Sequence, residues 1–476
     1  MTGNRSISVR RNKSRRAPRR GVIIVLTAIL MVFMLAMIAF AVDIGYIANA
    51  RTEIQRATDA AAYAGAGDLV YGTQAAGASA DQYLLLNKVA GQTLKSANAT
   101  YEFGNWNSST RAFTVTNTTP NAIRVTASAN QQPLFFGNAI GNASFNVTGK
   151  SVATYQPRDI GLVLDYSGSM AYDSQFKNIS LLGQTAIENN LKLIYQQLGS
   201  PVFGTLTMTP VSYGNSSTSN TTVIKNFKLD KVAYPYPGGS WSEYVDYVQT
   251  DSYVNAAGYR NKYGYLTWVN YLLYAQCGNA DTPALKNCSV QPVTALKDAV
   301  DVFLSFLTEN STDDRVALAI YTYSDSTAIL ESGLTKTYST ISSICRGRQA
   351  GHYIGGTNIS AGMTKARLEV QNNARSGAQK MLIVMTDGVV NLPTGNTTTD
   401  KAKVITEANL CAAAKIPVVT IALGAYADTD LMQQVADITG GVAFVVPGGQ
   451  PIAQVQAQLE AVFAQVAADR PLKLVQ

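Results

Sequence analysis

From residue 158 onward, short apolar runs alternate with longer segments in which apolar residues recur every three or four positions. The short runs are typical of buried strands and the longer segments of amphipathic helices, such as the one that carries Leu296, Val300 and Phe303. Strands separated by helices favour an α/β fold with a doubly wound, mostly parallel sheet that is covered on both faces. The predicted order is strand 159–164, helix 293–307, strand 315–322, helix 359–371, strand 380–386, helix 401–414, strand 417–423, helix 428–438, strand 442–446 and helix 450–467.

Polar side chains follow the first strand of this series. Asp165, Ser167 and Ser169 stand at alternate positions of Asp-Tyr-Ser-Gly-Ser-Met, directly after the apolar run 160–164. One carboxylate and two hydroxyls in one loop suit a hard cation such as Mg²⁺ or Ca²⁺, because these ions prefer oxygen ligands. A polar turn that binds no metal is the alternative interpretation of this pattern.

Two later segments place further oxygen ligands at the same edge of the predicted sheet. Thr357 follows two glycines just before the helix at 359–371, and Asp387 directly follows the strand 380–386. Because ligands of a parallel sheet bind beyond the carboxyl ends of its strands, both side chains are expected near Asp165. Two carboxylates balance the charge of a divalent cation, and neutral hydroxyls leave it able to accept another oxygen.

In this order, the three elements resemble the metal-ion-dependent adhesion site of the von Willebrand factor type A family, over roughly residues 158–470. The resemblance implies Mg²⁺ as the cofactor, with Mn²⁺ or Ca²⁺ as alternatives. It also implies a protein partner whose Asp or Glu carboxylate completes the coordination shell. The metal ligands that it implies are Asp165, Ser167, Ser169, Thr357 and Asp387.

A long insertion is expected inside this domain. The predicted type A domain spans 156–472, but residues 171–291 separate the first metal loop from the helix at 293, which follows that loop closely in the family. A segment of this length in a compact domain requires structure of its own. Its many Tyr and Trp residues between Tyr234 and Tyr274 suit either its own core or a recognition surface that helps to choose the partner.

The N-terminus combines a basic tail, residues 1–20, with an uncharged apolar segment, residues 21–42. Eight Arg and Lys residues precede Gly21 and no acid precedes Asp43, so this tail accounts for the whole net charge of +7 and a nucleic-acid-binding domain is not expected. The apolar segment extends roughly 33 Å as a helix, enough to cross a bilayer. The positive flank predicts a single-pass protein of the inner or cytoplasmic membrane, with a cytoplasmic N-terminus and a periplasmic or extracellular head. A signal peptide cleaved after Ala39-Phe40-Ala41 is the alternative.

Beyond the apolar segment, residues 43–68 continue with small and apolar residues at helical spacing, and the block ends in Asp59-Ala60-Ala61-Ala62-Tyr63-Ala64-Gly65. Together with Ala41-Val42-Asp43-Ile44-Gly45, this block resembles the N-terminal segment of TadE/TadG-like proteins of tight-adherence pilus assembly. The resemblance implies pilus-assembly proteins as partners, in a bacterium. Gly21 is followed by an apolar run without the glutamate of the pilin-like members, which argues against processing and assembly as a pilin subunit.

Residues 69–155 are rich in Thr, Asn, Ser and Ala, with short alternating runs between turn residues, which predicts a small β-rich module that spaces the head from the membrane. Four cysteines follow it. Cys277 and Cys288 are close enough in sequence to form a disulfide, and Cys411 is expected as a buried thiol, but the sequence does not fix the connectivity.

Catalysis is not expected, and no catalytic residue is assigned. The only histidine is His352, for which a solvated loop position and the rim of the metal site are both open. The serines of the metal loop are not in a G-x-S-x-G nucleophile elbow. The sequence therefore predicts a membrane-anchored adhesion or pilus-assembly protein that binds a protein partner through Mg²⁺. A structural envelope scaffold, whose head the metal only stabilises, is the alternative.

Overall fold

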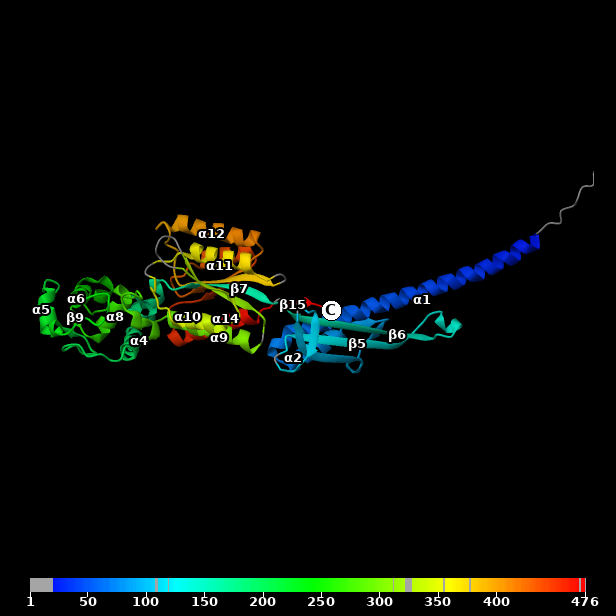
Figure 1. Cartoon of the computed structure of the whole chain (residues 1–476), viewed down its shortest axis with the longest axis horizontal. Coiled ribbons are helices and arrows are strands. Elements are labelled where there is room, and N and C mark those ends of the chain that lie inside the picture. Colours follow the sequence, from blue (N-terminus) through cyan, green and yellow to red (C-terminus); the bar gives the residue numbers. More distant parts are fainter. Residues whose placement is uncertain are drawn as a thin grey trace, which may run out of the picture. The chain divides into compact units, whose positions relative to one another are not determined.

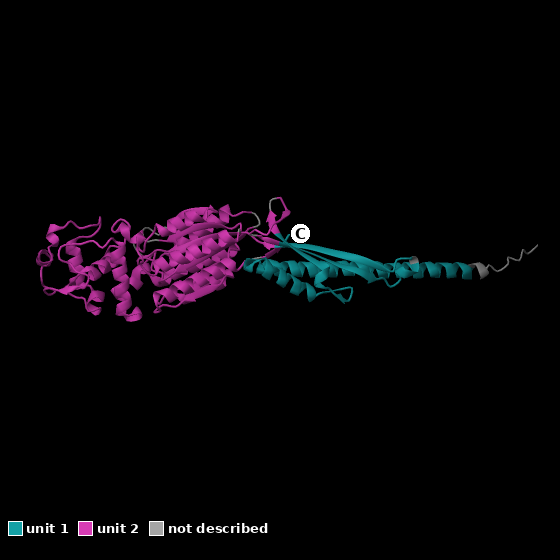
Figure 2. Ribbon diagram, turned by 90° about the horizontal axis from the view of Figure 1, so that it is seen from below, with its two compact units in different colours: residues 1–103, 123–153, 474–476 teal, residues 104–122, 154–473 magenta. Residues whose placement is uncertain are grey.

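The computed structural model describes residues 20–107, 110–118, 120–310, 312–321, 328–353, 356–375, 378–470 and 472–475. The chain forms two compact units, shown in different colours in Figure 2. Unit 1 comprises residues 1–103, 123–153 and 474–476, and unit 2 comprises residues 104–122 and 154–473. The predicted basic tail, 1–20, lies outside the described residues except for Arg20.

Unit 1 is built on one long helix, α1, which runs without interruption from Arg20 to Gly67. Its N-terminal half is apolar and exposed, and it is long and apolar enough to cross a membrane. In its C-terminal half, Ala50, Ile54 and Ala57 are buried on one face. A Cβ at Gly65 would come within 2.8 Å of Ile123 and 3.0 Å of Ala76, so the small residues predicted to line this helix allow its neighbours to approach closely.

A second helix of unit 1, α2 (Thr73–Leu85), packs on α1 and was not predicted. Its buried residues Ala76, Ala80 and Leu84 recur every four positions, a helical signal within a segment otherwise typical of strands. The predicted β-rich module therefore contains a helix as well as strands. The strands form a five-stranded sheet of order β15-β6-β5-β3-β4, of which residues 104–122, 154–155 and 472–473 belong to unit 2. Their bounds are β3 Ala99–Asn107, β4 Ala112–Val115, β5 Ala122–Pro133, β6 Ser144–Tyr155 and β15 Leu472–Leu474, and a separate hairpin pairs β1 (Lys88–Val89) with β2 (Gln92–Thr93).

Unit 2 contains the predicted α/β sheet, and the fold class is confirmed. Five of its six strands run parallel, and the edge strand β11, which was not predicted, runs antiparallel to β10. The order is β11-β10-β7-β12-β13-β14. The strands are β7 Arg158–Asp165, β10 Arg315–Tyr321, β11 Ala328–Thr335, β12 Gln379–Thr386, β13 Val418–Leu423 and β14 Ala443–Val446.

Helices cover both faces of this sheet, as Figure 1 shows. One face packs against α9 (Val293–Glu309), α10 (Tyr338–Arg346) and α14 (Ile452–Ala468), and the other packs against α11 (Ile359–Asn373), α12 (Thr397–Ala413) and α13 (Thr429–Thr439). Alternate residues of β7 face the two cores, since Leu162 and Leu164 belong to the first and Val163 to the second. Cys411 is buried in the second core, as predicted.

The insertion folds into short helices and a two-stranded ladder beyond the carboxyl end of β7 (Figure 1). Most of its aromatic residues, including Tyr244, Tyr263 and Trp268, are buried in a core continuous with the first face of the sheet, which confirms the own-core interpretation for them. Cys277 and Cys288 are free thiols rather than a disulfide. The elements are α3 Ile179–Leu182, α4 Gln184–Gln197, β8 Val211–Ser212, α5 Asn220–Asn226, α6 Trp241–Thr250, α7 Ser252–Ala256, β9 Lys262–Tyr263 and α8 Tyr265–Ala275.

Buried charges hold the start of β7 in place. The Arg158 side chain is fully buried and donates to Asp314 Oδ2 at 3.0 Å, and Arg470 donates to the same oxygen at 2.8 Å. The Arg158 guanidinium also donates to the carbonyl oxygens of Val466 at 2.9 Å and Ala467 at 3.1 Å, near the end of α14. Every charge at this end of the strand therefore has partners of opposite sign or backbone acceptors.

The neighbouring residue, Asp159, is neutralised in the same way. Arg315 donates to both of its carboxylate oxygens, at 2.9 and 2.8 Å, and Arg375 donates to Oδ1 at 2.8 Å. Burial raises the pKa of Asp159, but the hydrogen bonds from Arg315 and Arg375 outweigh it and hold that pKa below its ordinary value.

Candidate metal centre

The end of β7 delivers Asp165 and Ser167 to the carboxyl edge of the sheet. Asp165 is fully buried, and its Oδ1 accepts a hydrogen bond of 2.8 Å from the backbone N–H of Ser167. Its Oδ2 accepts another, of 2.9 Å, from the hydroxyl of Thr386 on β12. The Ser167 and Ser169 hydroxyl oxygens lie 2.9 Å apart, so the predicted loop places three oxygen ligands together.

Asp387 and Thr357 come from elements distant in sequence and meet this loop. The hydroxyl of Ser169 donates to Asp387 Oδ1 at 2.6 Å. Thr357 Oγ1 lies 3.5 Å from Ser167 Oγ, and the backbone N–H of Thr357 is fixed by a 2.8 Å bond to Asn391 Oδ1. The structure thus brings together all five side chains that the sequence singled out. Gly355, which precedes Thr357 in the same segment, lies outside the described residues.

Two buried acids lie close enough in this cluster for one to shift the pKa of the other. Burial and the nearby charge of Asp165 raise the pKa of Asp387 well above its ordinary value, although the hydrogen bond from Ser169 opposes the shift. Among the residues that the structure describes, no salt bridge involves Asp165 or Asp387. Two buried carboxylates without a cation are costly, and a divalent ion removes that cost.

The donor set is consistent with a hard ion and not with a soft one. Within the described part of the chain, no group of three or more His, Cys, Asp or Glu side chains is placed to hold a metal. The centre relies instead on two carboxylates and the hydroxyls of Ser167, Ser169 and Thr357. Oxygen ligands of this kind fit Mg²⁺, Mn²⁺ or Ca²⁺.

A cavity of about 460 Å³ opens over the centre and gives a ligand access to it. Ser167, Ser169 and Thr357 line its floor, and Tyr172 and Tyr426 contribute aromatic rings. Lys177, from the start of the insertion, places its ammonium group over the Tyr172 ring, 3.6 Å from the centroid. Burial lowers the pKa of Lys177, and the negative charge of Asp387 partly offsets this effect.

Sequence reasoning missed several residues of this region. Thr386 orients Asp165 but was treated only as part of a strand, and Tyr426, in the loop after β13, lies at the same edge of the sheet. The rule that located Asp387 also applies to the loop after β13, so that signal was available. Lys177 and Asp173 lie within a dozen residues of Asp165 in the sequence, but nothing in their pattern marks them.

His352 lies in a turn but is half-buried rather than solvated, and it is not among the residues that line the cavity over the candidate centre. Its ring is half-buried against Tyr353, with the ring centroids 4.6 Å apart. Burial lowers the pKa of His352 to about 4, so the imidazole is neutral at pH 7.

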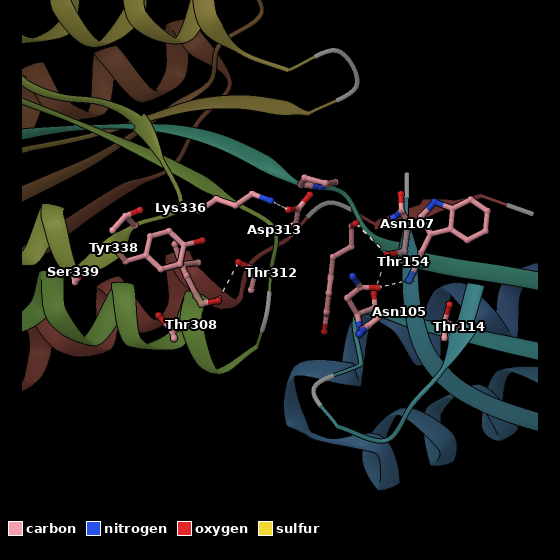
Figure 3. Close-up of a pocket in the computed structure, with 16 residues that line it drawn as sticks. Asn105, Asn107, Thr114, Thr154, Thr308, Thr312, Asp313, Lys336, Tyr338 and Ser339 are labelled. Carbon is pink, nitrogen blue, oxygen red and sulfur yellow. Dashed lines mark hydrogen bonds and ion pairs between the residues drawn. The ribbon is translucent and has the colours of Figure 1, made fainter. Parts of the chain in front are cut away.

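A larger cavity of about 1050 Å³ lies elsewhere in unit 2, and Figure 3 shows its lining. Its charged groups are already satisfied, since Lys336 is paired with Asp313, and the Tyr338 hydroxyl donates to the carbonyl oxygen of Asp314 at 2.7 Å. None of the five candidate ligands lies in it.

Comparison with known protein families divides the chain in the same way. Residues 21–68 match the Flp pilus-assembly TadE/G-like family, and residues 59–153 match a Tad-like Flp pilus-assembly family. Residues 286–389 match the von Willebrand factor type A domain. Thr357 and Asp387 fall inside this match, whereas Asp165 lies outside it, on the other side of the insertion.

Among solved structures, the chain resembles a von Willebrand factor type A protein from Catenulispora acidiphila at 12% identity, over 77% of this chain and 49% of that one, with a TM-score of 0.33. It resembles the pilus adhesin SpaC from Lactobacillus rhamnosus GG at 13% identity, over 74% of this chain and 34% of SpaC, with a TM-score of 0.33. It also resembles proximal thread matrix protein 1 from the mussel byssus, in a structure with a zinc-occupied MIDAS motif. The identity is 15%, over 67% of this chain and 97% of that protein, with a TM-score of 0.30. Likenesses of this size do not bear on function.

No curated protein matches the chain. The family matches and the geometry of the sheet nevertheless agree with the resemblances seen in the sequence. The chain joins an N-terminal segment of the Tad pilus-assembly families to a head that contains a von Willebrand factor type A domain.

Proposed function

We propose that this protein is a membrane-anchored adhesion or pilus-assembly protein that binds a protein partner through Mg²⁺. The observation that carries the proposal is the meeting of Asp165 and Asp387, both buried, with the hydroxyls of Ser167 and Ser169 and with that of Thr357 from a third segment. No salt bridge neutralises the two acids in the described part of the chain. A bound Mg²⁺ supplies a Lewis-acidic position for one more oxygen ligand.

A carboxylate is the partner group that best suits the open coordination position of the bound ion. The five side chains contribute two negative charges, which a divalent ion balances, and the cavity over Ser167 and Thr357 leaves room for an incoming group. An Asp or Glu side chain is a hard anionic donor that suits this position. Lys177 adds a positive charge next to Tyr172, which lines the cavity, and this charge interacts with that of Asp387.

The N-terminal segment supports a location at a membrane. The apolar part of α1 is long enough to span a bilayer, and the basic residues before Gly21 support a cytoplasmic N-terminus with the head on the opposite side. The Tad families support partners among pilus-assembly proteins.

The direct test is divalent-cation binding by calorimetry, with the full chain in detergent micelles. We expect Mg²⁺ or Mn²⁺ to bind wild type and not Asp165→Ala. Asp173→Asn is the matched control, because Asp173 lies near the centre but is hydrogen-bonded to Asn178 at 2.7 Å and is not among the five ligands. Absence of binding to the folded wild type would disprove the metal site.

The second test concerns the partner. Pull-down with the full chain, with and without EDTA, should recover an envelope protein only in the presence of the metal. Capture that persists after Asp387→Ala would favour the alternative function, a structural scaffold in which the metal only stabilises the head.

We further propose that the insertion helps to select the partner, because its Tyr172 lines the cavity and its Lys177 lies over the Tyr172 ring. Replacing Lys177 by Met keeps the length of the side chain and removes its charge. We expect partner binding to weaken by up to about fivefold, the size of an exposed charge interaction, with metal affinity unchanged or slightly increased. Lys192→Met, on α4 of the same insertion, is the control. Titration of the captured partner against each variant gives the comparison.

A further inference from the structure

The hairpin between β5 and β6 lies beside α1, and its tip is hydrogen-bonded to Asp43 of that helix. Figure 1 shows these long strands beside α1. Asp43 Oδ1 accepts hydrogen bonds from the backbone N–H groups of Phe135 at 2.9 Å and Phe136 at 3.2 Å, and Oδ2 accepts a third from Phe136 at 3.1 Å. The tip of this hairpin, residues 134–145, is therefore held at the level of residue 43 of the helix.

Asp43 occupies a special place along α1. It is the first charged residue after the apolar segment 21–42, so it marks the level at which the helix leaves the hydrocarbon core. A carboxylate at this depth is costly unless its oxygens are satisfied. The hairpin provides that satisfaction, and Asp43 is only 7% exposed as a result.

The tip that covers Asp43 is apolar and aromatic. Phe135 is 65% exposed and Phe136 is 48% exposed, although both belong to a folded hairpin. On its inner side, Phe135 packs edge-on against Tyr46 of α1, with ring centroids 4.9 Å apart, and Phe145 does the same at 5.6 Å. The sequence has no charged residue from Val125 to Gly149, so nothing in the tip resists contact with lipid.

We propose that the tip of the β5–β6 hairpin is a second membrane contact, seated in the interfacial layer of the bilayer that α1 crosses. Phe135 and Phe136 insert at the boundary between headgroups and acyl chains, and Asp43 fixes the hairpin at that depth. Amphipathic and aromatic side chains are enriched at this level, because they remove apolar surface from water without entering the hydrocarbon core.

A bilayer fits the observations better than a protein partner does. The exposed rings lie directly beyond the end of the spanning segment, so any chain whose α1 crosses a membrane brings them to its surface. Exposed apolar residues of α1 itself, Phe40 and Ile44, stand on either side of Asp43 at 56% and 48% exposure. The helix and the hairpin tip therefore present one continuous apolar zone at this height.

The test uses Phe135→Trp and Phe136→Trp in the full chain, reconstituted in phosphatidylcholine vesicles with brominated acyl chains. The wild-type protein, which has three Trp residues, supplies the background emission. Tyr71→Trp is the control, since Tyr71 is also aromatic and 74% exposed, but lies beyond the far end of α1, roughly 40 Å from Asp43 along the helix. Circular dichroism verifies that each variant is folded.

We expect lipid brominated near the top of its chain to quench the new emission at 135 and 136, more strongly than lipid brominated near its methyl end. Tyr71→Trp should lose no emission in either lipid. Quenching at 135 and 136 no greater than at 71 would overturn the proposal. A blue-shifted emission without bromine quenching would place the tip against protein instead, and would overturn it as well.

The positioning role of Asp43 has its own test. In the Phe135→Trp background, Asp43→Ala removes the acceptors for the hairpin and should reduce the quenching, whereas Asp43→Asn keeps one acceptor oxygen and should retain more of it. Equal quenching in all three proteins would show that Asp43 does not set the depth of the hairpin.

Discussion

Strand β7 buries an arginine at its first residue and an aspartate at its last, and the two ends differ in how these charges are compensated. At the start, Arg158 and Asp159 meet Asp314, Arg315 and Arg375 in close ion pairs. At the end, Asp165 meets a second acid, Asp387, and only hydroxyl and backbone donors. The first arrangement is complete within the chain, whereas we propose that an added cation completes the second.

This difference separates structural charge from functional charge on one element. Both ends are buried, so exposure alone does not distinguish them. Net charge distinguishes the two ends. The cationic and anionic groups at the start of β7 neutralise one another, whereas the two carboxylates at its end carry charge of the same sign. Substitutions at the two ends should therefore have opposite effects on the metal-free protein.

The largest effect is expected at the start of β7. Asp314→Ala leaves Arg158 and Arg470 buried without their carboxylate, and should lower the free energy of unfolding by about 3–5 kcal/mol. Denaturant unfolding of the full chain in detergent measures it. Asp313→Ala is the control, because Asp313 is 43% exposed in its ion pairs and should cost no more than about 1 kcal/mol. If both variants lost the same free energy of unfolding, the buried ion pairs of Asp314 would stabilise the protein no more than the exposed ones of Asp313.

The next effect is stabilisation by metal at the other end. At a Mg²⁺ concentration about 100 times its dissociation constant, the free energy of unfolding should rise by about 2.7 kcal/mol. Asp165→Asn should abolish this gain, because one of the two charges that hold the ion is lost. Thermal unfolding with Mg²⁺ and with EDTA provides the measurement. A gain that survives Asp165→Asn would place the ion elsewhere.

A smaller effect, of opposite sign to that of Asp314→Ala, is expected for Asp387→Asn in EDTA. This substitution removes one of two buried like charges and keeps an acceptor for the Ser169 hydroxyl. The free energy of unfolding of the metal-free protein should rise by about 1–3 kcal/mol, a magnitude comparable to the cost of burying an unsatisfied polar group. A loss of stability in EDTA would show that the carboxylates at this end are compensated after all.

The smallest expected effect is a loss of stability at acidic pH. The pKa of Asp159 is lower in the folded protein than in the unfolded chain, so its ion pairs contribute stability above the unfolded pKa of about 3.8. This contribution is lost as the pH falls from there through the folded pKa. Unfolding measured at falling pH should show a steeper loss for wild type than for Asp159→Asn. Identical slopes would contradict the assignment.

Much of unit 2 was predictable because apolar periodicity and strand order follow from local sequence. The strands ending at Asp165 and Asp387 are nearly as predicted, and the edge rule for parallel sheets brought Thr357 to the same place. The antiparallel strand β11 was missed because its residues are half exposed and do not form an apolar run. The hydrogen bonds of the buried Arg158 side chain were also not predicted, since its partners Asp314 and Val466 lie 156 and 308 positions away in the sequence.

The insertion and unit 1 were less predictable. In the insertion, the division of one helical stretch into α3 and α4 at Gly183, whose φ is +86°, was not predicted. In unit 1, the bond between Asp43 and the hairpin joins residues 92 positions apart, and no periodic pattern marks such a contact. Composition did identify the aromatic core of the insertion, because Tyr and Trp at this density must bury much of their surface.

The contact between Arg158 and the end of α14 sets an order on folding. Arg158 is among the first residues of the type A head to be synthesised, yet the carbonyl groups of Val466 and Ala467 that it binds are among the last. A chain that lacks α14 therefore has no backbone acceptors from this helix for the buried guanidinium at the start of β7. We expect such a truncated chain to be less stable than the full chain, because a buried charge that loses its partners is costly.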